Sequence, residues 1–453
     1  MKIEEGGIMS KVFFISAGQL DIKKERSIKN TKNMYLNYGA LLLASIVKDA
    51  GFNTILIHGH FKSPIDFTEE LLSIGIMETK YPIFISIPSF FALSWVNELT
   101  KILKNDKRIK TKIHVGGRWV IDDSPENLKK ALPYIDDVIS GLGENKILPY
   151  LTQKEDDKNH TDTPLNYNIL YERELFQPSI EVSRGCGKSC FFCQERNVPL
   201  TKLKEPDKIV SEYKSILLND SLNKMNLYFE CSNFKPNTKW INELIKKRED
   251  NNVYFNWRTE SRVDSINIEM IPLLAKAGLT VIDLGLESAS KQQLQRMDKT
   301  KNPDSYLKKA SLLLKECKKN NIKTKVNIML YAGETMDTVN ETMKWLNYHR
   351  DFIYGVSVGC VLSFGWSSNK NKIDFIEHLK SLGASVSDRK NITGITRFNL
   401  SNEINYEKSS KIAEEISEKF MSLDRYFYLK SFSYYPRNYT KEHFLKDISF
   451  EKK

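Results

Sequence analysis

The chain has 453 residues, which at roughly 150 residues per domain corresponds to two or three domains and excludes a single small module. Charged residues make up 28% and hydrophobic residues 41% of the sequence, so the composition excludes a disordered or membrane-embedded chain. Lys and Arg outnumber Asp and Glu by 68 to 57, a net charge of +11, which is compatible with a nucleic-acid partner.

The sequence predicts a cytoplasmic protein. Residues 1–14 lack the basic and apolar regions of a secretory signal. The longest apolar runs, such as residues 40–44, are far shorter than the ~20 residues that span a bilayer. Six cysteines in so long a chain do not suggest a disulfide framework, which favours a reducing compartment.

The first 150 residues alternate short apolar runs with helical periodicity. Strands are predicted at residues 11–16, 53–58, 83–87, 112–115 and 137–140, with helices at 38–50 and 95–104. This alternation is typical of right-handed βαβ units in a doubly wound, Rossmann-like parallel sheet with helices on both faces. Ligands of such sheets bind at the carboxyl ends of the strands. The candidate ligand-binding residues at that edge are Ser86, Ser89, Gly116, Gly117, Gly141 and Glu144.

A second α/β series follows a polar linker. Its strands are predicted at residues 179–183, 225–229, 253–257, 280–286, 323–330 and 355–362, with helices such as 206–217 and 240–247. Six such repeats predict a partial (β/α)6 TIM-type barrel. The predicted organisation is a Rossmann-like domain at 1–151, a linker at 152–175, the barrel at 176–364 and a mostly helical C-terminal extension at 365–453.

Three cysteines form the strongest chemical signal of the sequence. Cys186, Cys190 and Cys193 are spaced Cys-x3-Cys-x2-Cys after a predicted strand, and three soft thiolates suit an iron–sulfur cluster. A four-iron cubane bound this way leaves one iron open to a substrate or cofactor. One alternative is a zinc site, which requires a fourth ligand that no His or Cys nearby in the sequence provides. The other is that the three cysteines bind no metal.

The segment SRGCGKSCFFC resembles the radical S-adenosylmethionine (SAM) superfamily, and the resemblance extends over residues 179–362. It implies a [4Fe-4S] cluster on the three cysteines, with the amino and carboxylate groups of SAM on the open iron. It also implies reductive cleavage of SAM to methionine and a 5′-deoxyadenosyl radical that abstracts hydrogen from a substrate. An external electron donor such as flavodoxin or ferredoxin would supply the electron.

The same resemblance implies a SAM-binding set. Phe192 stands where the family has an aromatic residue beside the adenine, and Glu230 where an acidic residue receives the SAM amino group. Arg262 resembles the basic position that meets the SAM carboxylate, while Glu287 and Ser288 resemble a motif near the ribose. The alternatives are structural: either carboxylate can stabilise a helix N-terminus, and Arg262 can form an ordinary surface ion pair.

The first domain resembles the cobalamin-binding domain that precedes the barrel in many radical SAM enzymes. This resemblance implies that cobalamin is bound by the six residues at the edge of the N-terminal sheet: Ser86, Ser89, Gly116, Gly117, Gly141 and Glu144. The Asp-x-His-x-x-Gly motif that supplies an axial His to cobalt is absent, and His58-Gly59-His60 stands in this region instead. Both histidines are interpreted as surface residues at a strand end. A domain that keeps the fold without binding corrinoid is the alternative.

The sequence therefore predicts a class B (cobalamin-dependent) radical SAM methyltransferase that methylates an unactivated carbon of a small molecule, lipid or peptide. Without corrinoid, the same barrel would catalyse epimerisation, rearrangement or bond formation. Cys231 and Cys360 are candidate hydrogen donors only if they face the barrel, and Cys317 is expected to be packed. A metal-bearing RNA-binding protein is the alternative of another class, although the lysines are spread in short runs typical of solvated faces.

Overall fold

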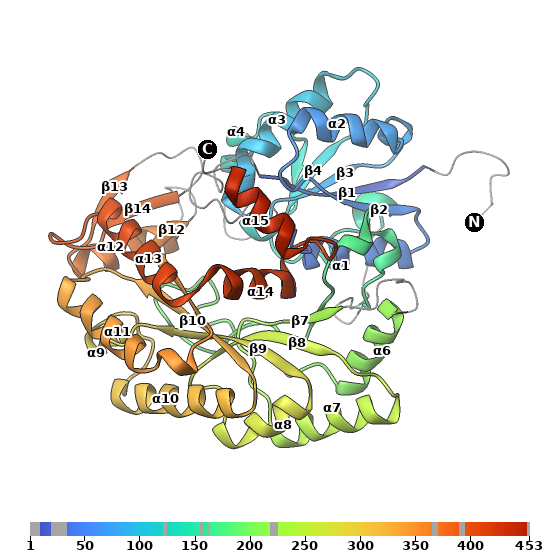
Figure 1. Ribbon diagram of the computed structural model, residues 1–453. Helices are drawn as coiled ribbons and strands as arrows, with labels where there is room; N and C mark the ends of the chain where they lie inside the picture. The colour runs from blue at the N-terminus through green and yellow to red at the C-terminus, as the bar shows by residue number, and fades with distance from the viewer. Residues whose placement is uncertain are drawn as a thin grey trace.

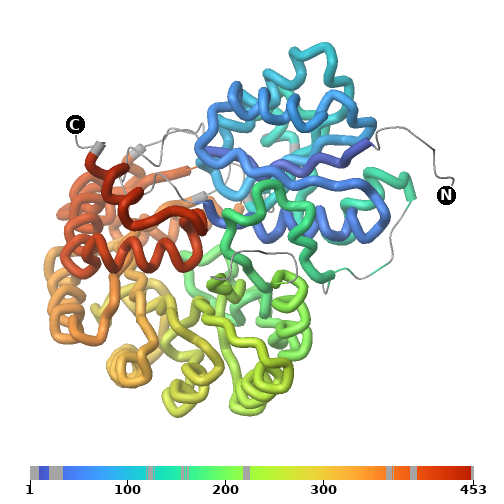
Figure 2. Tube along the Cα trace, turned by 45° about the vertical axis from the view of Figure 1, so that its right-hand side comes forward, coloured from blue at the N-terminus to red at the C-terminus, as the bar shows by residue number. Residues whose placement is uncertain are grey.

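The computed structural model describes residues 10–19, 34–120, 125–154, 158, 160, 163–217, 225–364, 370–388 and 395–450. A parallel sheet with its helices forms the upper layer in Figure 1, and a second parallel sheet with outer helices forms the lower layer. The C-terminal helices lie beside and between these layers (Figures 1 and 2). None of the described helices is long and apolar enough to cross a membrane.

The upper sheet is doubly wound, as the sequence predicts. Its strands pair in the order β2-β1-β3-β4-β5 and all run parallel. The strands are β1 (Val12–Ser16), β2 (Thr54–His58), β3 (Ile83–Ser86), β4 (Ile113–Gly116) and β5 (Asp137–Val138). The main helices are α1 (Tyr38–Asp49), α2 (Pro64–Ser73), α3 (Leu93–Asn105), α4 (Pro125–Ala131) and α5 (Pro149–Thr152). The winding direction reverses between β1 and β3, which makes a switch point at their carboxyl ends.

The two faces of this sheet bury different partners. Helices α2 and α3 pack on one face, around the fully buried Phe67 and Trp95. Helix α1 packs on the other face, in an apolar cluster that also contains Ile216 and Met225 from the second α/β series. The N-terminal domain is therefore joined to the barrel through a shared hydrophobic core.

The lower sheet forms a six-stranded partial barrel with β6 and β11 at its edges. Its strands are β6 (Ser179–Glu181), β7 (Asn226–Glu230), β8 (Asn256–Arg262), β9 (Leu279–Glu287), β10 (Lys323–Leu330) and β11 (Gly355–Cys360). The outer helices are α6 (Pro206–Leu217), α7 (Thr238–Asp250), α8 (Ile271–Lys276), α9 (Lys291–Arg296), α10 (Pro303–Lys319) and α11 (Met336–Tyr348).

Strand β8 begins three residues later than the predicted strand at 253–257 and continues to Arg262. Val253 and Phe255 are apolar because they pack in the core just before the strand. Along the strand, Trp257 and Thr259 face one side, and the charged Arg258 and Glu260 face the interior of the barrel. Because charged residues occupy the inward positions, the sequence lacks the apolar run that predicts a buried strand.

The C-terminal extension contains a small antiparallel sheet in addition to the predicted helices. Its helices are α12 (Lys370–Ser381), α13 (Tyr406–Phe420), α14 (Leu423–Ser433) and α15 (Lys441–Phe450). Strands β12 (Leu362–Phe364), β13 (Ser385–Asp388) and β14 (Ile395–Asn399) pair in the order β12-β14-β13. Helix α13 bonds to the edge strand β11, where the Ser417 hydroxyl accepts from the Val358 N–H at 3.2 Å.

A buried ion pair ties α14 to the inner face of the barrel. Arg258 on β8 donates two hydrogen bonds to Asp283 on β9, at 2.6 and 2.9 Å, and both side chains are only 1% exposed. Lys325 on β10 also contacts Asp283 at 3.0 Å. Arg258 Nη1 donates to the Leu429 carbonyl of α14 at 2.6 Å. The buried network of Arg258 and Asp283 is therefore complete only when three strands and α14 are in place.

Substituting Arg258→Met is expected to lower the free energy of unfolding by about 3–5 kcal/mol, because Asp283 keeps its buried charge with Lys325 alone. Urea denaturation of the full chain measures the loss. Tyr435→Phe, in the separate aromatic cluster of α14 and α15, is the matched control and should cost less than half as much. Equal losses from the two substitutions would contradict the role given to the ion pair.

Candidate functional site

The three predicted cluster ligands lie on a loop at the carboxyl end of β6. Gly185 and Gly187 both have left-handed backbone angles, with φ of 71° and 68°. A Cβ atom on Gly185 would collide with the carbonyl oxygen of Pro199. The loop therefore needs glycine there to turn Cys186 and Cys190 toward the barrel.

The three thiols influence one another electrostatically. Burial raises the pKa of the Cys193 thiol, and the charges of Cys186 and Cys190 raise it further. Burial likewise raises the pKa of Cys186, while the nearby Arg262 lowers it. In the described part of the chain, no three His, Cys, Asp or Glu side chains are grouped around a single ion. A cubane does not require such a grouping, because each of its cysteines binds a different iron.

Contacts from three surrounding segments fix the loop. The Asn233 amide, which is fully buried, donates to the Cys186 carbonyl at 3.1 Å. Lys188 pairs with Asp264 at 3.1 Å. The Ser189 hydroxyl bonds to Asp298 at 2.8 Å, and the Phe191 N–H donates to the Met297 carbonyl at 3.0 Å. These contacts hold the cysteines against the ends of several barrel strands.

A chain of contacts connects the loop to the predicted SAM residues. Arg262 Nη1 donates to the Cys190 sulfur at 2.9 Å, and its Nη2 donates to the Lys299 carbonyl at 2.6 Å. The Lys299 ammonium pairs with Glu287 at 2.9 Å and lies 5.9 Å from the centre of the Phe192 ring. The structure thus brings together Phe192, Arg262 and Glu287, as the sequence predicts.

Sequence reasoning missed Lys299, which is 5% exposed. Lys299 lies twelve positions after Glu287, and no pattern in the sequence marks it. Only the folded chain brings its ammonium group to Glu287. Tyr331, at the end of β10, was also missed. It is fully buried, its hydroxyl has no hydrogen-bond partner among the described residues, and its ring meets Phe192 edge-on at 6.4 Å. A bound molecule beside Phe192 would supply that partner.

Glu230 lies away from this chain of contacts, in a row of carboxylates on the inner face of the barrel. Strand pairing sets it beside Glu181 on β6, and Glu260 follows on β8. Burial raises the pKa of Glu230 to about 7, and the charges of Glu260 and Glu181 raise it too. Glu260 is accessible to solvent, so water reaches this part of the barrel interior.

Ser288 and the remaining cysteines face other parts of the fold. The Ser288 hydroxyl bonds to Thr342 of α11 at 3.1 Å, so it does not point to the site with Glu287. Cys231 lies 3.2 Å from the Thr259 hydroxyl, and Cys360 contacts Ser409 of α13 at 3.3 Å. Cys317 is fully buried in the core, as predicted.

The N-terminal edge residues have contacts within the fold. The Ser86 hydroxyl accepts from the Asn37 amide at 3.1 Å, whereas the buried Ser89 hydroxyl has no partner among the described residues. A Cβ on Gly117 would meet the Ile87 backbone, and one on Gly116 would lie 3.0 Å from the Ile139 carbonyl oxygen. Gly141 takes a left-handed φ of 74°. Close packing therefore explains the glycines without a ligand.

Glu144 links the two domains. Its carboxylate contacts Arg184 at 2.6 Å, and Arg184 also bonds to Glu181 at 2.8 Å. Arg184 stands two residues before Cys186, so the edge of the N-terminal sheet is fastened to the start of the cysteine loop. Arg118 of the same edge lies 3.7 Å from Glu195, just after the loop.

The interpretation as a surface residue is wrong for His58, whereas His60 is half-buried. His58 is 5% exposed, and burial lowers its pKa well below the usual value. Burial also lowers the pKa of His60, to about 3. The two rings stack 5.2 Å apart, and Phe176 packs 4.7 Å from His58. The sequence hid this arrangement because Phe176 comes from the distant segment before β6.

Comparisons with known proteins agree with this geometry. Residues 180–346 match the model of the radical SAM superfamily. The anaerobic magnesium-protoporphyrin IX monomethyl ester cyclase of Rubrivivax gelatinosus is 25% identical over 263 residues, 49% of this chain and 46% of the cyclase. A putative methylthiotransferase of Methanocaldococcus jannaschii is 26% identical over 316 residues, 62% of this chain and 65% of that protein. The chain thus spans 46% to 65% of the length of these relatives.

Two solved structures share the fold. The radical SAM methyltransferase TsrM from Kitasatospora setae has a TM-score of 0.61 at 14% identity, with 84% of this chain and 79% of TsrM covered. The cobalamin-dependent SAM radical enzyme OxsB has a TM-score of 0.64 at 14% identity, with 90% of this chain and 66% of OxsB covered. Residues 180–346 thus match a radical SAM domain, and the fold of the whole described chain, a doubly wound sheet followed by a partial barrel, is similar to the folds of TsrM and OxsB.

Proposed function

We propose that this protein is a class B radical SAM methyltransferase, which uses cobalamin to methylate an unactivated carbon of a small-molecule, lipid or peptide substrate. The observation that carries the proposal is the position of the cysteine loop. It lies at the open end of the barrel and is fastened through Arg184 and Glu144 to the edge of the N-terminal sheet, where ligands of such sheets bind.

The residues present fit a [4Fe-4S] cluster and SAM, which are the cofactors of a radical SAM domain. Cys186, Cys190 and Cys193 would hold the cluster, and Arg262 stabilises the Cys190 thiolate by donating to its sulfur. When bound, the cluster supplies the electron that cleaves SAM to methionine and a 5′-deoxyadenosyl radical. A flavodoxin or ferredoxin is the proposed source of that electron.

Four side chains are proposed to orient SAM. Phe192 packs against the adenine, and the ionised Glu230 accepts a hydrogen bond from the amino group of SAM. Glu287 and its partner Lys299 form a buried pair that is placed to bind the ribose and the carboxylate. Arg262, the predicted carboxylate ligand, is already engaged by Asp264, Lys299 and Cys190, so its main contribution is to the cluster.

Cobalamin, when bound, supplies a methyl group that SAM alone does not deliver to such a carbon. Support comes from the buried Ser89 hydroxyl at the sheet edge, which has no partner in the described part of the chain, and from the shared fold with OxsB and TsrM. The internal contacts of Ser86 and Glu144 favour the second candidate, a domain without corrinoid beside a barrel that performs other radical chemistry.

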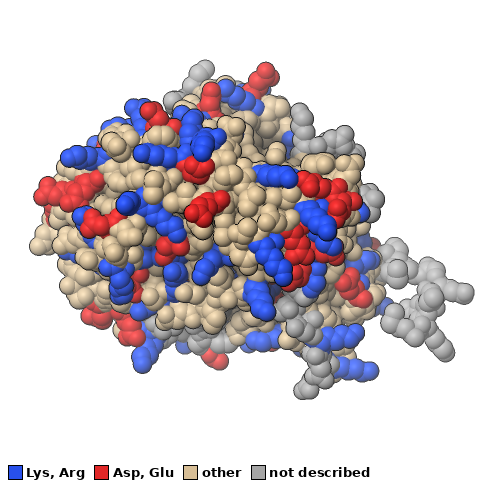
Figure 3. All heavy atoms as spheres, turned by 90° about the horizontal axis from the view of Figure 1, so that it is seen from below, with Lys and Arg blue, Asp and Glu red and all other residues tan. Residues whose placement is uncertain are grey.

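The charge distribution on one face of the molecule disfavours the RNA-binding alternative. On the face shown in Figure 3, Lys and Arg are interspersed with Asp and Glu rather than gathered in one basic patch. A nucleic-acid site usually concentrates its positive charge along one face or groove.

Cluster loading provides the first test. Anaerobic reconstitution of the full chain should give about four irons per chain and, with dithionite and SAM, 5′-deoxyadenosine. Cys190→Ala should abolish both, whereas Cys317→Ala, a core substitution, should retain them. Salt-sensitive RNA binding that Cys190→Ala leaves intact, without any 5′-deoxyadenosine, would instead support the RNA-binding alternative.

Glu230 makes SAM binding dependent on pH. Since its pKa is raised to about 7, the carboxyl group is neutral at lower pH and must lose its proton to accept fully from the N–H groups of the SAM amino group. The dissociation constant for SAM should therefore rise up to about tenfold per pH unit below pH 7. Calorimetry between pH 6 and 8 measures it. Glu230→Gln should bind weakly without this pH dependence, and the exposed Glu269→Gln should behave like the unaltered protein.

Methyl transfer decides between the two candidate functions. Protein produced with hydroxocobalamin should retain about one corrinoid per chain after gel filtration, and label from methyl-deuterated SAM should pass to a carbon of the substrate. Formation of 5′-deoxyadenosine by a protein that retains no corrinoid would favour the cobalamin-independent chemistry.

A further inference from the structure

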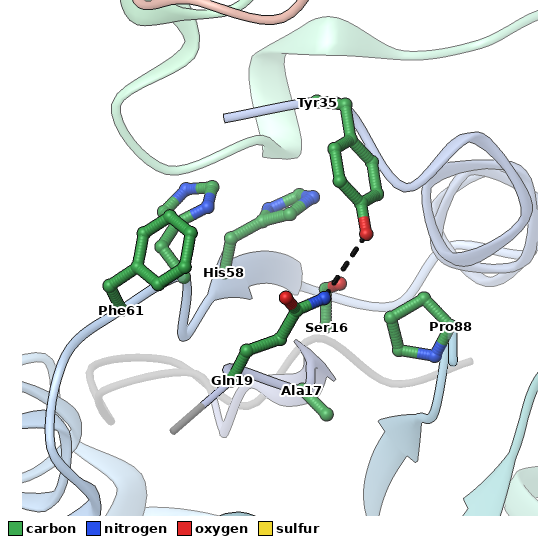
Figure 4. A pocket seen from close by; sticks show the side chains of 8 residues that line it. Ser16, Ala17, Gln19, Tyr35, His58, Phe61 and Pro88 are labelled. Carbon is green, nitrogen blue, oxygen red and sulfur yellow. Dashed lines mark hydrogen bonds between the residues drawn. The ribbon is translucent and has the colours of Figure 1, made fainter. Parts of the chain in front are cut away.

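A small polar cavity lies at the switch point of the N-terminal sheet. Its volume is about 20 Å³, and the lining residues include Ser16 at the end of β1, His58 at the end of β2 and Pro88 after β3. Gln19 and Tyr35 close it from the loops. Figure 4 shows the Gln19 amide and the His58 ring beside this space. The reversal of strand order between β1 and β3 makes this the expected ligand position.

Hydrogen bonds around the cavity determine the protonation of His58. The Asn37 N–H donates to His58 Nε2 at 3.1 Å, so this nitrogen is an acceptor. Because burial keeps the ring neutral, Nδ1 must carry the proton. His58 Nδ1 has no partner among the described residues, so it presents an unused N–H donor.

Gln19 presents the complementary group. Its Nε2 donates to the Tyr35 hydroxyl at 3.3 Å (the dashed line in Figure 4). Its Oε1 has no partner among the described residues, although the residue is only 8% exposed. A buried polar atom without a partner costs about 1–3 kcal/mol. Two such atoms of opposite character at one cavity indicate a ligand with an acceptor beside a donor.

We propose that His58 and Gln19 form a subsite for a primary carboxamide, whose oxygen accepts from His58 Nδ1 and whose nitrogen donates to Gln19 Oε1. The inference rests on the proposed function in one respect: the carboxamide belongs to a corrinoid, which carries several such groups around its ring. The cavity has room for the end of a polar side chain and not for the ring itself, which would remain outside it.

The surroundings hold both groups in place. The Asn37 amide nitrogen donates to Ser16 and Ser86 at 3.0 and 3.1 Å, so it ties the ends of β1 and β3 to α1. His60 stacks on His58, and its carbonyl accepts from the Gln19 N–H at 2.6 Å. The two binding atoms therefore belong to a built site and not to mobile surface side chains.

The test measures corrinoid binding by absorbance titration of the full chain, independently of catalysis. Gln19→Met keeps the side-chain size and removes the acceptor, and should weaken hydroxocobalamin binding about 5- to 20-fold, as the loss of one buried hydrogen bond. His58→Phe should have a similar effect. His114→Phe is the matched control, since His114 on β4 is also buried, its Nδ1 has no partner among the described residues, and it does not line the cavity.

A second probe identifies the carboxamide as the group recognised. A corrinoid with its side-chain amides converted to methyl esters has no N–H to donate to Gln19. Relative to the matching amide corrinoid it should bind the unaltered protein more weakly, and the part of this loss due to Gln19 should disappear in Gln19→Met.

Each other outcome overturns the subsite. Equal corrinoid affinity in Gln19→Met and the unaltered protein, at unchanged melting temperature, would mean that the cavity holds only a water molecule. Equal weakening in Gln19→Met and His114→Phe would mean a general loss of fold. If the unaltered protein binds no corrinoid, the subsite and the cobalamin part of the proposed function both fail, while 5′-deoxyadenosine formation still tests the radical SAM activity separately.

Discussion

The buried contact between Arg258 and Asp283 organises the interior of the barrel. Two ions with 1% exposure are stable there only if every charge and donor is matched. Asp283 consequently forms ion pairs with both Arg258 and Lys325, and Arg258 also donates a hydrogen bond to the Leu429 carbonyl of α14. This use of the two cations leaves Glu230 and Glu260 without an ion-pair partner among the described residues, in a space that water reaches. The network that stabilises the barrel thus also makes part of its interior able to receive a cationic group.

The same logic explains how the cysteine loop is positioned. Arg262 and Arg184 are both partly satisfied by carboxylates, Asp264 for the first and Glu144 with Glu181 for the second. Arg262 still reaches the sulfur of Cys190, and Arg184 reaches the other domain. A loop that must hold three thiolates near one another needs positive charge close by. Here the positive charge comes from Arg184 and Arg262, which are held by carboxylates of the two domains. The position of the loop therefore depends on how the two domains are arranged.

Sequence reasoning worked where the signal is local. The glycines and cysteines of the loop, the strand β10 and the helix α6 (Pro206–Leu217) are defined by short patterns, and the structure has them at or near the predicted positions. It failed where the partner is distant in the chain. The strand predicted at 253–257 lies later in the chain, as β8, because Arg258 and Glu260 face the polar interior of the barrel and interrupt the apolar pattern. Lys299 and Tyr331 are not marked by any sequence pattern. Tyr434 likewise has no pattern in the sequence that places its ring 5.3 Å from the Arg258 guanidinium.

His58 shows why such distant contacts matter for function. A histidine after a strand, in the sequence His58-Gly59-His60, gives no sign of burial, because the residues that bury it are Phe176 and the Asn37 region. Once they are in place, the Asn37 N–H fixes which ring nitrogen carries the proton, and the second nitrogen is left facing the cavity. The carboxyl ends of β1 and β2 therefore supply a hydrogen-bond donor whose direction is set by the fold. His58 does not belong to the motif that supplies an axial cobalt ligand, yet its position suits the proposed binding of a carboxamide at the edge of the corrin ring.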